Sequence, residues 1–375
     1  MSNDSILLKP IRLGEIELPN RIIMASMTRA RTENVTHVPI PLQAEYYSQR
    51  ASAGLIMTEG TWPSKEAIGA INVPGLFNRE QVEGWKRVTD AVHEAGGRIV
   101  VQLGHIGAAS HPDLLGGEQP VGPSAISLNC DAFTPEGPKP VPVPRPMTID
   151  DIHRTVEHYA HSTRLAQEAG FDGVELHGIA NYLVPQFLSE LTNQRDDEYG
   201  GSAENRARFP LELLAGMVSE WSAGRVGMKL SPGISMGTIV PTEETLPTYE
   251  HLVSRISEMK LAWIQFLNPV TDLLGPPADL TGTPVAALQN GSAPHFRRFF
   301  TGPIIANGSL TKERAEAVIE AGYADAAAFG ALYLSNPDLV ERFVQGLALA
   351  PIPSKDTWYA GGATGYADYP RAAAA

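Results

Sequence analysis

The residues best suited to chemistry lie in one short stretch, residues 173–183, with the sequence GVELHGIANYL. Val174 to Leu176 are predicted to form a short buried strand, and a helix is predicted to open near Asn181. His177 leaves that strand, and Tyr182 follows five residues later, in the expected first helical turn. A histidine can donate a hydrogen bond to an oxygen, and a tyrosine can donate a proton. We therefore interpret this turn as the chemical centre of the protein.

Eight short apolar runs recur along the chain, and most of them precede a helical pattern. Continuous apolar runs, rather than alternating ones, are typical of strands that are buried on both faces of a parallel sheet. Eight such units are the count of a (β/α)8 TIM barrel, an α/β fold, which we favour over an open doubly wound sheet. The predicted strands are residues 22–27, 55–60, 98–103, 174–176, 226–230, 263–267, 303–308 and 325–330.

The predicted helices connect these strands. The best-defined one opens at Thr148, with Asp151 three residues on in the arrangement of a capping box, and ends near Ala169. Residues 1–375 are predicted to form a single domain. Residues 105–147 are a Pro- and Gly-rich loop insertion after the third strand and a candidate lid, and residues 350–375 are a C-terminal tail. The other predicted helices are 46–53, 80–95, 204–223, 247–259, 295–300, 311–322, capped by Ser309 or Thr311, and 337–347.

The composition narrows the class of function. With 43% hydrophobic and 19% charged residues, the chain has the composition of an ordinary globular protein. A net charge of −13 argues against partners such as nucleic acids and anionic membranes, and no apolar run is long enough to predict a membrane span. The only cysteine, Cys130, excludes an internal disulfide, and the N-terminus does not predict a signal peptide. These features favour a cytoplasmic protein that acts on a small molecule.

In a TIM barrel, the active site lies at the carboxyl ends of the strands. The residues expected there include an acid, a cation, an imidazole and several amides. They include no Ser-His-Asp set, no clear carboxylate pair and no His/Cys metal site, so hydrolysis by a nucleophile or a metal is not indicated. Glycines near the last two strand ends could expose backbone N–H groups to a phosphate. In strand order, the residues are Ser26, Met27, Thr28, Gly60, Thr61, Gln102, Gly104, His177, Tyr182, Lys229, Asn268, Asn307, Gly308, Gly330 and Ala331.

Short motifs are spread over the whole chain, and the segment from Glu175 to Arg206 is the most specific. The other stretches are PNRI (19–22), MA (24–25), MTR (27–29), YYSQRA (46–51), GLI (54–56), GL (75–76), VQL (101–103), NPDL (336–339), GY (365–366) and DYP (368–370). On these motifs, the chain resembles the old yellow enzyme family of FMN-dependent ene-reductases. Most motif residues are interpreted as scaffold, and we expect structural ion pairs from Arg195, Glu198, Glu204 and Arg206.

The resemblance implies that FMN lies across the barrel mouth, that NADPH reduces it, and that hydride passes to the β-carbon of an activated alkene. Thr28 would then hydrogen-bond the flavin, and Gln102 would bind its pyrimidine edge. His177 would hold the activating oxygen of the substrate, and Tyr182 would protonate the α-carbon. The family includes monomers and dimers, so a monomer or a homodimer is expected. The remaining implied contacts are Ser26, Met27, Gly60, Lys229, Asn307, Gly308, Phe329 and Gly330 for the cofactor, and Tyr359 above the pocket.

On the substrate side, the chain departs from the family pattern at several positions. Ala180 stands where the family has a second His or Asn, three residues after His177. Asn181 is adjacent, but one helical residue turns a side chain by about 100°, so we do not expect it to be a replacement. Gly104 and Ala108 stand where the family has a Trp and an Arg, and both changes predict a larger pocket.

On the cofactor side, two arginines of the family pattern are missing. Lys229 replaces the arginine that faces the flavin, so it keeps the charge but loses the planar fork. Ala331 replaces the arginine that pairs with the phosphate, which should cost about 1.5–3 kcal/mol of binding free energy.

Three hypotheses follow. The first is an FMN-dependent reductase or isomerase that acts on a bulky conjugated carbonyl compound of natural-product type. The second is an FMN-free isomerase or cyclase, in which His177, Tyr182 and Lys229 polarise a carbonyl without redox change. The third is a binding protein on an inactive scaffold, in which these side chains are ordinary hydrogen-bonded or solvated residues of the barrel mouth.

Overall fold

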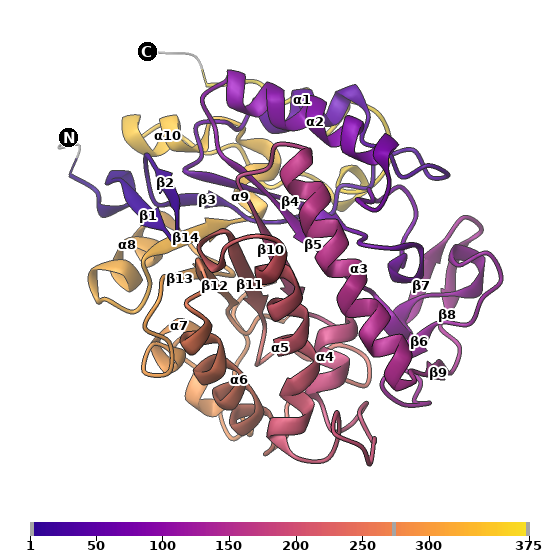
Figure 1. The fold of residues 1–375 in the computed structure, drawn as a ribbon. Helices are drawn as coiled ribbons and strands as arrows, with labels where there is room; N and C mark the ends of the chain where they lie inside the picture. Colours follow the sequence, from indigo (N-terminus) through magenta and orange to yellow (C-terminus); the bar gives the residue numbers. More distant parts are fainter. Residues whose placement is uncertain (1–3, 272–274, 373–375) are drawn as a thin grey trace.

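A closed barrel of eight parallel strands forms the centre of the molecule (Figure 1). The computed structural model describes residues 4–271 and 275–372. Around the ring, the strand order is β10, β11, β12, β13, β14, β3, β4 and β5, so the predicted TIM barrel is confirmed. The strands are β3 (Ile22–Met24), β4 (Leu55–Thr61), β5 (Ile99–Leu103), β10 (Gly173–Gly178), β11 (Val226–Leu230), β12 (Trp263–Leu267), β13 (Ile304–Asn307) and β14 (Ala326–Phe329).

Helices surround the barrel on its outer side (Figure 1). As predicted, Thr148 and Asp151 form a capping box at the start of α3, and Thr311 caps α8. The helices are α1 (Pro41–Ser48), α2 (Arg79–Glu94), α3 (Ile149–Glu168), α4 (Leu183–Leu188), α5 (Ala203–Glu220), α6 (Thr245–Met259), α7 (Ser292–Phe296), α8 (Lys312–Glu320), α9 (Ala331–Ser335) and α10 (Leu339–Gln345).

Three helix predictions were wrong in their bounds, and one of them is α7, which spans Ser292–Phe296 instead of residues 295–300. Helix α1 begins at Pro41 instead of residue 46, because a proline fits the first helical position, where its missing N–H is not needed. The predicted last helix, 337–347, is shorter and begins at Leu339, and α9, which directly follows Gly330, was not predicted.

A hairpin that the sequence did not predict closes the amino-terminal end of the barrel. Its strands are β1 (Ile11–Leu13) and β2 (Ile16–Leu18), joined through Gly14 at φ +57°. The hairpin's buried side chains pack in one cluster with Leu55 and Trp263, the first residues of β4 and β12. Apolar side chains therefore fill the barrel interior at this end.

The insertion at residues 105–147 is more ordered than the predicted loop. It contains two small sheets, one of β6 (Val121–Gly122) with β9 (Arg145–Pro146) and one of β7 (Asp131–Thr134) with β8 (Gly137–Pro140). Its role as a lid stays a prediction.

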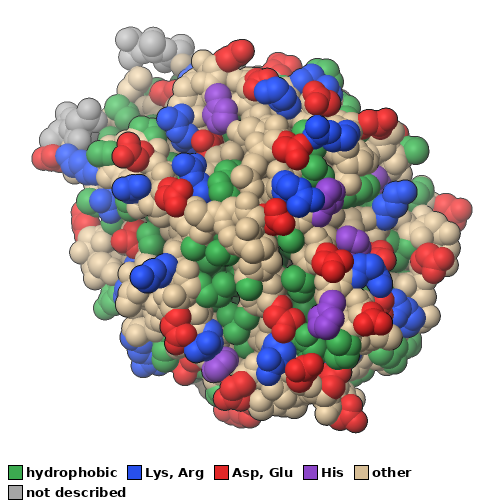
Figure 2. Space-filling model, in the orientation of Figure 1, with side chains coloured by type: hydrophobic (Ala, Val, Ile, Leu, Met, Phe, Trp, Pro, Cys, Tyr) green, Lys and Arg blue, Asp and Glu red, His purple; other side chains and the backbone are tan. Residues whose placement is uncertain are grey.

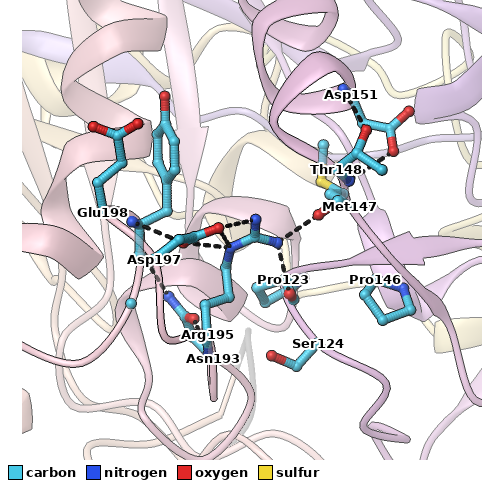
Figure 3. A network of polar contacts seen from close by, with 12 residues as sticks. Pro123, Ser124, Pro146, Met147, Thr148, Asp151, Asn193, Arg195, Asp197 and Glu198 are labelled. Atoms are coloured by element: carbon cyan, nitrogen blue, oxygen red, sulfur yellow. Dashed lines mark hydrogen bonds and ion pairs between the residues drawn. The ribbon is translucent and has the colours of Figure 1, made fainter.

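Arg195, in the segment after α4, binds this insertion at two points, one near its middle and one at its last residue (Figure 3). Its Nη1 atom donates to the carbonyl oxygens of Pro123, at 3.1 Å, and Met147, at 2.5 Å. Its Nε donates to Asp197 Oδ1 at 2.9 Å, and this guanidinium holds the pKa of Asp197 below its usual range. The prediction that Arg195 is a scaffold residue with an ion pair is therefore confirmed.

The same interpretation is right for Arg206, which pairs with Glu244 at 3.0 Å and donates to the Leu188 carbonyl at 3.1 Å. It was wrong for Glu198 and Glu204, because neither carboxylate forms an ion pair with a residue in the described ranges.

Acidic and basic side chains are intermixed on the face shown in Figure 2. In the part of the chain that the structure describes, no helix combines the length and apolar character needed to cross a lipid bilayer.

We expect Arg195→Ala to lower the free energy of unfolding by roughly 1.5–3 kcal/mol, because it removes charged hydrogen bonds that are largely buried. Urea unfolding measures this loss, and hydrogen exchange should show faster exchange in residues 121–147. Arg164→Ala is the matched control, since its ion pair with Glu220 is exposed and contributes little. Equal stability of the two variants would contradict the fastening role of Arg195.

Candidate active site

The carboxyl end of the barrel opens into one pocket, and most of the predicted site residues line it. His177 and Tyr182 face this same pocket, as their placement on one turn predicted. The predicted residues around it are Ser26, Met27, Thr28, Gly60, Gln102, His177, Ala180, Tyr182, Lys229, Asn307, Gly330 and Tyr359, and those that sequence reasoning missed are Ala25, Arg29, Ile179, Leu267, Leu334 and Trp358.

The structure places Gly104 and Ala108 away from the pocket. A Cβ atom on Gly104 would lie 3.3 Å from the His177 Cβ and 3.5 Å from the Tyr182 ring, so those two side chains fill the space above it. Ala108 is buried against Gly122 in the cluster beneath the insertion. Neither position lines the pocket, so the structure gives no support to the prediction that they enlarge it.

Several other predicted site residues contact the surrounding segments instead of lining the pocket. The Asn181 amide donates to Cys130 Sγ at 3.4 Å. Asn268 accepts a hydrogen bond from the Ser292 N–H at 3.0 Å and, with Gly308, lines a separate hollow beside α8. Phe329 packs on the ring of Phe343, with the centroids 5.5 Å apart. The structure therefore does not bring Asn181, Asn268, Gly308 and Phe329 into the pocket.

The turn between β10 and α4 sets the positions of His177 and Tyr182. Ala180 adopts φ +61°, and Tyr182 is the N-cap residue of α4, so the residues before it are not helical. The prediction of Tyr182 in the first helical turn was wrong by one position, and the helical rotation argument for Asn181 does not apply. The turn brings the imidazole and phenol rings into a stack, with the centroids 4.0 Å apart and the planes 22° apart.

A buried amide that sequence reasoning missed holds this turn in place. Gln186 donates from Nε2 to the carbonyl oxygens of Asn181, at 2.7 Å, and Ile106, at 2.9 Å. Its Oε1 accepts the N–H of Ala108 at 3.0 Å. Gln186 belongs to the PQFL run after Tyr182, and a polar residue within that apolar run was the available signal.

Burial sets the protonation states of the stacked pair. It lowers the pKa of His177 to about 3, with help from the positive charge of Lys229, so the imidazole is neutral at pH 7. It also raises the pKa of Tyr182 to about 12, with a smaller effect of Tyr359, so the phenol keeps its proton. Nδ1 of His177 is buried without a partner among the described residues. The site thus combines a neutral hydrogen-bonding imidazole with a proton-bearing phenol.

Lys229 supplies a buried cation on the pocket floor. Its Nζ donates to Ser26 Oγ at 3.1 Å, and its side chain lies beside the strand that carries His177. Burial lowers the pKa of Lys229 from 10.5 to about 8, and the Glu175 carboxylate opposes that shift. The ammonium is therefore charged at pH 7 and can donate hydrogen bonds to an electron-rich ligand atom.

One wall of the pocket comes from the tail, and buried arginines anchor it. Arg29 donates to the carbonyl oxygens of Trp358, at 2.9 Å, and Gly365, at 2.8 Å. Arg31 donates to the Thr357 carbonyl at 3.0 Å and lies 4.5 Å from the centre of the Tyr366 ring. These contacts fix Trp358 and the neighbouring Tyr359 beside the ligand space. The MTR motif contained Arg29, but its partners could not be read from the sequence.

Comparison with known proteins agrees with this geometry. Residues 6–350 match the family described as "NADH:flavin oxidoreductase / NADH oxidase family". The chain is 38% identical to the putative 12-oxophytodienoate reductase 3 of Oryza sativa subsp. japonica, over 97% of this chain and 92% of that protein. It is similar to the old yellow enzyme homologue from Zymomonas mobilis, with a TM-score of 0.89 and 36% identity over 97% and 99% of the two chains. The structure of morphinone reductase gives a TM-score of 0.90 with 39% identity, over 99% of this chain and 97% of that one. With its family, fold and pocket in agreement, the chain belongs to the NADH:flavin oxidoreductases, the old yellow enzyme family.

Proposed function

We propose that the protein uses FMN, with NADPH as reductant, to reduce or isomerise the activated C=C bond of a conjugated carbonyl compound. The observation that carries this proposal is the stacked pair of a neutral imidazole and a protonated phenol beside one pocket. The His177 imidazole can hold the carbonyl oxygen of the substrate. The Tyr182 phenol can then give its proton to the α-carbon.

The pocket floor fits a flavin ring. A Cβ atom on Gly60 would find only Gln102 Oε1 nearby, at 4.0 Å, so a flat ring can approach the backbone there. Gln102 and Thr28 offer polar groups to the ring, and the Lys229 ammonium offers positive charge. Bound in this place, FMN supplies the hydride that the β-carbon of the substrate receives.

Side chains of the protein itself would bind the substrate, donate the proton and exclude water. The neutral His177 imidazole donates a hydrogen bond to the carbonyl oxygen and adds no positive charge to the site. The carbonyl is therefore polarised without a second acid that competes with Tyr182. Trp358 and Tyr359 border the same space and limit the access of water to the reacting carbon. The side chain of Ala180 offers no hydrogen bond, and its N–H donates to Ser231 Oγ at 3.2 Å, so the substrate oxygen depends on His177 more than in the family pattern. Loss of one such donor costs about 2.7–4 kcal/mol in comparable sites.

The phosphate of FMN would bind mainly to backbone groups. Gly330 lines the pocket and follows β14 directly before α9, whereas Gly308, at φ +95° after β13, lies in the separate hollow beside α8. Turns of this kind can direct N–H groups at an anion. No guanidinium follows Gly330, because Ala331 takes that position.

The FMN-free isomerase or cyclase remains the second candidate, favoured by Ala331 and by the small side chain of Ala180. Its support is reduced because neither Gly104 nor Ala108 lines the pocket. For the same reason, the expectation of a bulky substrate now rests on Ala180 alone.

We expect the purified protein to be yellow or to bind added FMN, with an affinity limited by the missing phosphate partner. Ala331→Arg should strengthen FMN binding about 10–100-fold, because it restores a charged hydrogen bond. Quenching of FMN fluorescence measures the affinity, and NADPH oxidation with an enone tests the activity. The matched control is Ala95→Arg, an exposed position at the opposite end of the barrel. A colourless wild-type protein that refuses FMN would overturn the proposal in favour of the second candidate.

Tyr182→Phe should lower kcat with a conjugated ketone by about 10²–10⁴-fold, because it removes the proton donor and keeps the ring that stacks on His177. Thermal unfolding should be little changed. The control is Tyr323→Phe, since Tyr323 is exposed and lies outside the pocket. A turnover number equal to that of the wild type would rule out the acid role of Tyr182.

The charge of Lys229 should make the bound cofactor sensitive to pH. Because burial lowers the pKa of Lys229 to about 8, its positive charge is present below that pH and is lost above it. A cation stabilises the negative charge of reduced flavin, so the midpoint potential of the wild type should fall increasingly below that of Lys229→Arg above pH 8. An arginine stays charged over this range. Parallel pH profiles from dye-equilibrated reduction would refute this role.

A further inference from the structure

A buried carboxylate lies inside the barrel beneath the pocket, and no step of the proposed reaction uses it. Glu175 of β10 is fully buried. Its Oε1 accepts a hydrogen bond from Gln102 Nε2 at 2.7 Å, and its Oε2 accepts one from Trp263 Nε1 at 2.8 Å. Burial raises the pKa of Glu175, whereas the Lys229 charge and these two donors lower it. Each oxygen of the carboxylate therefore has a specific donor.

The contact with Glu175 determines which way the Gln102 amide points. A carboxylate only accepts hydrogen bonds, so Gln102 must turn its NH2 group toward Glu175. Its oxygen then faces the other way, toward the pocket space beside Gly60. Gln102 and Lys229 lie on β5 and β11, the strands that flank β10. The pocket floor therefore offers an acceptor on one side of β10 and a cationic donor on the other.

The indole of Trp263 keeps the carboxylate in this arrangement. Trp263 reaches Glu175 from β12, across β11, through the space that Gly227 leaves free. A Cβ atom on Gly227 would lie 2.0 Å from the Trp263 ring, so no other residue type fits there. Because the single N–H of the indole occupies Oε2, Oε1 is left for Gln102.

We propose that Glu175 is a positioning residue, which determines where the pocket floor presents a hydrogen-bond acceptor and where it presents a donor. The site therefore selects a ligand edge that carries an imide N–H beside a carbonyl. Glu175 acts through Gln102 and does not touch the ligand. The pyrimidine edge of a flavin carries this pattern, and N3-methylation of the flavin removes the N–H. The inference rests on the proposed use of FMN and adds a residue that the proposed reaction does not include.

Glu175→Gln tests the inference because the new side chain has the same shape but only one acceptor. If its oxygen accepts from Trp263, its NH2 group faces Gln102, and the Gln102 amide must turn over. The pocket then presents an N–H to the imide N–H of the ligand. We expect FMN affinity to fall about 10-fold or more, and the preference for FMN over N3-methyl-FMN to disappear. Fluorescence quenching measures both dissociation constants without any turnover.

The double variant Glu175→Gln/Trp263→Phe provides a rescue that a merely structural role would not produce. Without the indole N–H, the new amide oxygen is free to accept from Gln102, so the original orientation and the preference for FMN should return. Trp263→Phe alone should keep the preference, because the carboxylate still orients Gln102. Glu175→Asp keeps the charge but is one methylene too short to reach Gln102, so it should weaken the preference; it serves as the second test if Glu175→Gln does not fold.

The outcomes separate the two proposals. A wild type that does not bind FMN overturns the proposed function, and the inference falls with it. A wild type that binds FMN and prefers it over N3-methyl-FMN supports the proposed cofactor. If the folded Glu175→Gln or Glu175→Asp variant then shows the same preference as the wild type, the positioning role of Glu175 is wrong while the proposed function stands. A double variant without recovered preference would equally overturn the role.

Discussion

Closure of the strand ring is the constraint on which every other feature depends. The last strand, β14, pairs with the first barrel strand, β3, with Ala327 opposite Ile22, although about 300 residues separate them in the chain. This pairing brings the segment after β3 beside Gly330, where a Cβ atom would lie 3.5 Å from Met27 Sδ. Because all eight strands run parallel, their carboxyl ends must meet on one side. The stacked ring pair, the buried lysine and the tail wall can then share one small space.

The inside of the barrel is divided along its axis. The amino-terminal half is filled by apolar side chains and by the hairpin of β1 and β2. Nearer the carboxyl end, polar groups enter, and a buried polar group is costly unless it is paired. Of the pairs found there, Gln102 with Glu175 joins strands β5 and β10, and Lys229 of β11 pairs with Ser26 in the loop after β3. The groups that would serve a ligand are therefore held by contacts of the strands with each other and with the segment that follows β3.

The barrel could be predicted from the sequence because its strands are continuous apolar runs. Strands buried on both faces show this pattern whatever their order in the sheet. It was insufficient for the hairpin of β1 and β2, whose three-residue strands are too short to show a period. The bounds of α1 were missed because Pro41 was not recognised as a first helical residue.

For the site, the predicted ends of the strands were enough to indicate His177, Tyr182 and Lys229. The roles expected of Thr28 and Gln102 came from the family resemblance. The true surroundings of Gly104 could not be predicted, since the Tyr182 ring that covers it together with His177 follows the left-handed turn at Ala180. Contacts such as Gln102 with Glu175 join residues 73 positions apart, and no local pattern reports them.

The arginine anchors of the tail have a consequence for biosynthesis. Arg29 and Arg31 leave the ribosome early, but the carbonyl groups that they bind belong to residues 357–365. Until those residues emerge, the two guanidinium groups lack these acceptors, and burying them unpaired would be costly. A nascent chain can therefore close its barrel before the tail completes the wall of the pocket. A product truncated before Trp358 would lack this wall, so the two guanidinium groups would stay in contact with water and the pocket would stay open on that side.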